Sequence, residues 1–175
     1  MPEVTFLSNT MRKERINYLS VIIIAVITWI LQVSIFNRIL YFDTAPNFML
    51  LGSIFLGLTE GIFVGSIFGI ICSLFSASIF YDHSFYFSYP ICGAVAGFLT
   101  KKLFSDELLF FILLTFILVF PFELLNGWQF SLKNPINIFA RYTIVSFNGA
   151  TLNLIISPIF YYIMNFVTKK LKMRQ

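Results

Sequence analysis

Residues 46–81 read PNFMLLGSIFLGLTEGIFVGSIFGIICSLFSASIFY, an apolar stretch of 36 residues that is interrupted by a single charge, Glu60. As one continuous helix it would extend about 54 Å, whereas the hydrocarbon core of a bilayer is about 30 Å thick. The stretch therefore has to fold back on itself. We predict a turn at Thr59-Glu60-Gly61, which separates a short helix over residues 46–58 from a longer one over residues 62–81.

The composition of the whole chain supports a membrane protein. Of its 175 residues, 58% are hydrophobic and only 11% are charged, and the mean hydropathy is +0.86. A soluble domain carries about 25% charged residues, so this chain has too few charges to cover a surface in contact with water. Six spans of about 20 residues would use roughly 120 residues, which leaves no room for a soluble catalytic domain. We predict an all-α integral membrane protein without a soluble domain.

Four further apolar runs complete the predicted set of six spans. They cover residues 18–36, 85–100, 108–125 and 142–167, with Pro121 as a predicted kink near the end of the fifth. Residues 1–17 form a predicted N-terminal tail, and residues 168–175 form a basic C-terminal tail. Residues 126–141 include Trp128 and Pro135 and are interpreted as an interfacial loop, because Trp prefers the headgroup level.

The basic residues indicate the orientation of these spans. With six crossings, nine of the 12 Lys and Arg residues lie on the same side as both termini. Because cytoplasmic loops are enriched in Lys and Arg, we predict that both termini are cytoplasmic and that the protein is multi-pass in a bacterial cytoplasmic membrane. The basic clusters flank apolar runs, so the pI of about 9.1 indicates contact with membrane lipid and not with nucleic acid. The nine residues are Arg12, Lys13, Arg15, Lys101, Lys102, Lys169, Lys170, Lys172 and Arg174.

Small residues recur at every fourth position through the third predicted span, and the fourth span repeats the pattern. Residues four apart share one face of a helix, and small residues allow two helix backbones to approach closely in lipid. Two interpretations follow: packing within one bundle, or a groove in which a helix of a partner protein docks. The residues concerned are Gly61, Gly65, Gly69 and Ser73, then Gly93 and Gly97, with Ser53 and Gly57 continuing the spacing before the turn.

Few polar side chains fall within the predicted spans. Glu60 is interpreted as a solvated residue of the turn, and Glu123 as a carboxylate that reaches the outer boundary, with Arg141 as a candidate partner. Asn148 and Asn153 are expected to make hydrogen bonds between helices. The chain has no motif of hydrolases, metalloproteases or P-loop enzymes. We therefore expect a non-enzymatic protein without a cofactor or a bound metal.

Several short motifs resemble the rod shape-determining protein MreD family. Gln32 in the first span is followed by Pro46-Asn47 and three apolar residues, and then by the glycine-rich third span. The last span contains Asn148-Gly149 and Pro158 ahead of a basic tail. Length, span count and orientation agree with the resemblance from about residue 17 onward. One position departs from it, because Ser73 stands where family members commonly carry an aspartate.

The resemblance implies a scaffold of the bacterial cell-elongation machinery. Such a protein would bind the shape protein MreC and, through it, help to couple MreB filaments to the peptidoglycan synthases. The alternative is a substrate-binding membrane component of an energy-coupling-factor vitamin transporter, which has a similar size and also uses six helices. Its ligand pocket would be lined by polar and aromatic residues near the outer face, for which the candidates are His83, Asn126, Trp128 and Gln129.

Overall fold

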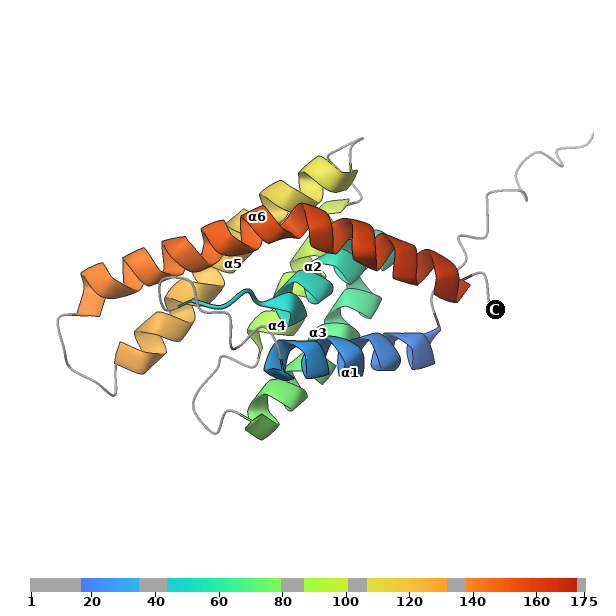
Figure 1. Cartoon of the computed structure of the whole chain (residues 1–175), viewed down its shortest axis with the longest axis horizontal. Coiled ribbons are helices and arrows are strands. Elements are labelled where there is room, and N and C mark those ends of the chain that lie inside the picture. The colour runs from blue at the N-terminus through green and yellow to red at the C-terminus, as the bar shows by residue number, and fades with distance from the viewer. Residues whose placement is uncertain (1–16, 35–43, 80–86, 101–106, 132–137, 173–175) are drawn as a thin grey trace, which may run out of the picture.

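The computed structural model describes residues 17–34, 44–79, 87–100, 107–131 and 138–172. These ranges contain six helices and no β-strand (Figure 1), which confirms the prediction of an all-α chain with six helices. The helices are α1 (Tyr18–Ser34), α2 (Phe48–Glu60), α3 (Ile62–Ile79), α4 (Ser88–Thr100), α5 (Glu107–Ser131) and α6 (Ile138–Lys172).

The predicted turn between the second and third helices is confirmed and is shorter than expected. α2 continues through Glu60, and only Gly61 separates it from α3. Gly61 has a φ angle of 102°, a conformation that costs little only for glycine. At the other end of α2, Asn47 is the N-cap and its side chain accepts a hydrogen bond from the backbone N–H of Leu50 at 3.0 Å. α2 therefore begins two residues later than predicted.

α5 and α6 are longer than the last two predicted spans, although the apolar segment Leu108–Leu125 of α5 coincides with the fifth. α5 continues to Ser131 and α6 begins at Ile138, so most of the expected interfacial loop over residues 126–141 is helical. α6 also continues to Lys172 through the first part of the predicted basic tail. Lys and Leu are good helix formers, and lysines in the last turn interact favourably with the carboxyl end of the helix dipole. A basic segment without Gly or Pro therefore extends the helix instead of ending it.

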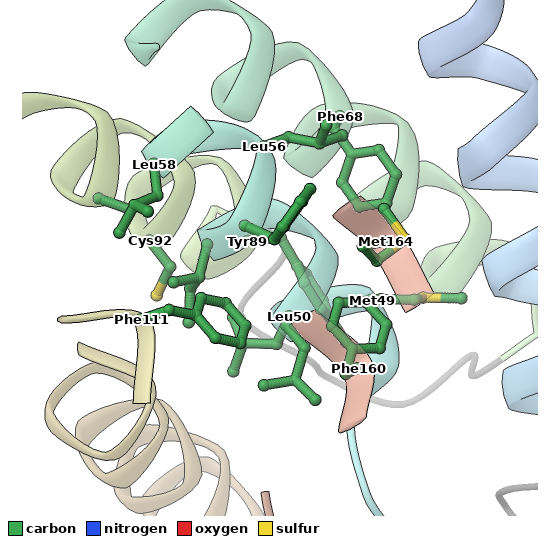
Figure 2. Close-up of a cluster of buried hydrophobic side chains, with 14 of the residues drawn as sticks. Met49, Leu50, Leu56, Leu58, Phe68, Tyr89, Cys92, Phe111, Phe160 and Met164 are labelled. Carbon is green, nitrogen blue, oxygen red and sulfur yellow. The ribbon is translucent and has the colours of Figure 1, made fainter. Parts of the chain in front are cut away.

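α2 lies at the centre of the molecule. All ten of its residues from Met49 to Leu58 are buried, as expected for a helix that is apolar on every side. The other five helices all contact it, with α3 and α4 as its most extensive neighbours. Figure 2 shows α2 residues Met49 and Leu50 together with Phe111 of α5 and Phe160 of α6. α5 and α6 also pack along each other.

The contacts between helix ends give the molecule two distinct ends. At one, the last residues of α1 and the first residues of α2 and α4 meet, and we call this the polar end. At the other, the turn between α2 and α3 meets the end of α4 and the end of α6, and we call this the basic end. α2 and α4 thus run from the polar end to the basic end, and α3 runs in the opposite direction, because Gly65 approaches Gly93 while Gly69 approaches Pro90.

Large apolar side chains cover much of the outer surface between the two ends. Ile22, Ile27 and Ile30 are exposed along α1, and Ile155, Tyr162 and Phe166 are exposed along α6. Monomeric soluble proteins rarely expose apolar patches of more than a few hundred Å². Two helical segments, Leu108–Leu125 and Thr143–Lys172, are long and apolar enough to cross a membrane, while α1 to α4 contain shorter apolar helices.

Candidate functional site

The polar end is organised around Gln32, the third-last residue of α1. Its amide Nε2 donates to the backbone carbonyl of Pro46 at 2.8 Å, and its Oε1 accepts from the backbone N–H of Phe48 at 2.8 Å. The Gln32 side chain therefore lies across the start of α2 and hydrogen-bonds one backbone group on each side of Asn47, the carbonyl of Pro46 and the N–H of Phe48. A buried amide needs such partners, because a polar group left without them costs about 1–3 kcal/mol.

Asn47 joins this cluster to two further helices. Its backbone N–H donates to Oδ1 of Asn153 in α6 at 2.8 Å, and its Nδ2 donates to the hydroxyl of Tyr89 in α4 at 3.3 Å. Asn153 is fully buried, and its Nδ2 donates to the carbonyl of Gly149 at 2.8 Å. We call Gln32, Asn47, Tyr89 and Asn153 the polar cluster. Its hydrogen bonds connect α1, α2, α4 and α6, so the interhelical role expected for Asn153 is present.

Glu123 lies beside the polar cluster. A Cβ atom built on Gly149 would lie 3.4 Å from Cγ of Glu123, so the α5 carboxylate is packed against the α6 backbone at this position. Glu123 is half-buried. The proposed pairing with Arg141 concerns a side chain outside the described part of the structure. Asn148 is half-buried, and it is Asn153 that contacts α2.

The predicted small-residue ladder lies where α2, α3 and α4 meet. A Cβ on Gly65 would be 2.5 Å from Cα of Gly57 and 2.9 Å from the carbonyl oxygen of Gly93, and a Cβ on Gly69 would be 2.5 Å from Cα of Pro90. Gly97 makes an equally close approach to Ile62. Helices of the same chain therefore cover these four glycines: Gly65, Gly69, Gly93 and Gly97. This is the arrangement expected if the small residues serve packing within one bundle.

Two members of the predicted ladder act differently from the rest. A Cβ built on Gly61 would meet no atom of the described residues within 4 Å, so the positive φ angle and not close packing requires glycine there. Ser73 is buried and donates from Oγ to the carbonyl of Gly69 at 2.8 Å. Its hydroxyl thus bonds within α3.

The basic end contains an ion pair that the sequence analysis missed. Nζ of Lys172 lies 2.5 Å from Oε1 of Glu60, and the Glu60 side chain is only 3% exposed. The interpretation of Glu60 as a solvated turn residue is therefore wrong. Glu60 is the last residue of α2, next to the single-residue turn at Gly61, and the end of α6 shields its carboxylate from water. The sequence signal for this ion pair was the basic run after the last predicted span. Lys172 belongs to that run, and it reaches Glu60 because the run continues α6 as a helix.

Pro158 lies inside α6, and Figure 1 shows that α6 changes direction along its length. Proline removes one backbone hydrogen bond and bends a helix, which accounts for this change of direction. The bend allows one helix to contact Asn47 at the polar end and Glu60 at the basic end. The candidate pocket residues His83, Asn126, Trp128 and Gln129 lie outside the residues whose side chains the structure describes.

No protein-family model, curated protein or solved structure that was compared with the chain matches it. The chemistry of the site therefore has to be taken from its geometry. The polar cluster uses its amide groups to bond backbone and side-chain groups of neighbouring helices, and the glycine contact brings three backbones together. Both arrangements hold helices in fixed positions.

Proposed function

We propose that the protein is a multi-pass protein of a bacterial cytoplasmic membrane. The alternating directions of α2, α3 and α4, the exposed apolar side chains between the two ends and the lysines gathered at one end all support this proposal. In this arrangement the basic end is cytoplasmic, because Lys and Arg are enriched on that side. With an even number of crossings, the proposal also puts both termini on the cytoplasmic side. α2 and α4 are 13 residues long, or about 20 Å, and cross only part of the hydrocarbon layer.

Within that membrane we propose a non-enzymatic scaffold of the cell-elongation machinery, similar to the MreD family. The observation that carries the proposal is the position of the residues that resemble the family. Gln32, the adjacent pair Pro46-Asn47 and Gly149 come from three separate parts of the sequence, yet all four residues take part in one hydrogen-bonded arrangement at the polar end. Motif residues that hold the helices of one fold together are expected to lie close to one another in space, as these residues do.

A scaffold function also suits the chemistry of the polar cluster. The amides of Gln32, Asn47 and Asn153 are used to connect helices, which fixes the outer surface that a membrane partner would contact. The partner we propose is an MreC-like protein, and through it MreB and the peptidoglycan synthases.

Depletion of the protein in a rod-shaped host tests the proposal. We expect cells to widen and become round, and an MreC-like protein to co-purify with the full chain from detergent extracts. Unchanged cell width after depletion would overturn the scaffold function. A small molecule that co-purifies in stoichiometric amount would favour the vitamin-transporter alternative. A reporter fused to the C-terminus tests the membrane topology separately, since we expect it to be cytoplasmic.

A further inference from the structure

The C-terminal part of α6 combines an apolar face with exposed positive charge. Four residues on one side of the helix, Ile159, Tyr162, Ile163 and Phe166, are each more than half exposed. Their spacing of three and four residues places them on a single face. The opposite face is buried against the rest of the molecule, with Tyr161, Met164 and Thr168 all below 10% exposed. We call the exposed face the α6 stripe.

Two lysines end this stripe. Lys169 and Lys170 are exposed, and within the described part of the chain neither has an acidic partner. Lys170 bends back over the stripe, with its Nζ 5.9 Å from the centre of the Phe166 ring. Lys172 differs from both, because its charge is already neutralised by Glu60. The helix therefore presents two available ammonium groups directly beyond a run of apolar side chains.

We propose that the α6 stripe and its two lysines bind an anionic phospholipid of the cytoplasmic leaflet. An acyl chain would lie along Ile159, Ile163 and Phe166, and the two ammonium groups would contact the headgroup phosphate. Basic residues close to an anionic membrane surface each contribute about 1 kcal/mol of attraction, which corresponds to about a fivefold change in binding. Lysine side chains reach headgroups readily because their stems remain in apolar contact. The inference rests on the membrane location proposed above but not on the scaffold function.

The test uses the full chain, purified in detergent and mixed with equal amounts of phosphatidylglycerol and phosphatidylcholine. The ratio of the two lipids bound is measured by mass spectrometry of the intact protein. We expect wild type to retain phosphatidylglycerol preferentially and K169Q/K170Q to lose this preference, by about fivefold for each lysine at low salt. K169R/K170R keeps both charges and should keep the preference.

A matched control removes the same net charge elsewhere. R38Q/K133Q changes two basic residues that the six predicted spans would put on the opposite side of the membrane, and it should bind both lipids as wild type does. An unchanged preference in K169Q/K170Q, or an equal loss in R38Q/K133Q, would overturn the proposed lipid site. A C-terminal reporter that is not cytoplasmic would instead contradict the proposed membrane topology, and the depletion phenotype tests the scaffold function independently.

Discussion

Replacing Gly65 by alanine tests whether the glycine contact holds the bundle together. The new Cβ would lie 2.5 Å from Cα of Gly57 and 2.7 Å from its backbone nitrogen, whereas ordinary contact begins at 3.4 Å. The obstacle is backbone, so it cannot move aside as a flexible side chain does. α3 must shift away from α2 by about 1 Å, and a gap of that size loses a quarter to a half of each dispersion contact.

We expect G65A to destabilise the protein, whereas helix propensity alone would predict that it stabilises it. Alanine in place of glycine inside a helix ordinarily stabilises by up to about 1 kcal/mol. Overpacking of a close-packed core costs about 1–3 kcal/mol, and here it affects the contacts of three helices. We therefore expect G65A to lower the free energy of unfolding by about 1–3 kcal/mol, measured by titration of the detergent-solubilised protein with sodium dodecyl sulfate.

Gly149→Ala is the matched control for this measurement. Its Cβ would lie 3.4 Å from Cγ of Glu123, the nearest atom and part of a flexible side chain, so G149A should be as stable as wild type or more stable by up to about 1 kcal/mol. If G65A is as stable as wild type or more stable, the close approach of α2, α3 and α4 is wrong. G65L should prevent accumulation of the protein itself. Normal accumulation with loss of only a partner would instead support the docking interpretation.

Two further predictions concern the contacts of α6. K172Q should lower the free energy of unfolding by about 3 kcal/mol, because it removes the Lys172 ammonium group from the buried Glu60 carboxylate, and E60Q/K172Q should lose less than the two single variants together. Additive losses in a double-mutant cycle would contradict the ion pair. N153A should cost about 1–3 kcal/mol, because the N–H of Asn47 loses its acceptor, whereas N148A should remain close to wild type. An equal cost for both variants in the same unfolding assay would contradict the assigned contact.

Sequence reasoning predicted the helices whose limits are set by strong local signals. The length of the apolar stretch required a turn near Glu60, and Gly61 is the residue there that accepts a positive φ angle. Helix ends without such a signal were predicted poorly. The residues around Ser131 and Lys172 do not indicate where α5 and α6 end, because those segments are compatible with both helix and coil.

The candidate site could be predicted only as separate pieces. The glycine spacing indicated a helix contact, and Asn153 was expected to bond between helices, but neither pattern names its partner. The hydrogen bond from Asn47 to Asn153 and the ion pair of Glu60 with Lys172 join residues more than 100 positions apart. Such pairings depend on how the helices pack and on the direction change within α6, which a single sequence does not specify.

α6 contacts both ends of α2, at Asn47 through Asn153 and at Glu60 through Lys172. During synthesis α2 leaves the ribosome about 100 residues before these partners exist. The hydrogen bond of Asn47 with Asn153 and the ion pair of Glu60 with Lys172 can therefore form only after the last helix has been synthesised. A nascent chain that terminates before Asn153 forms neither of these two contacts. A tag placed after Gln175 leaves both contacts intact.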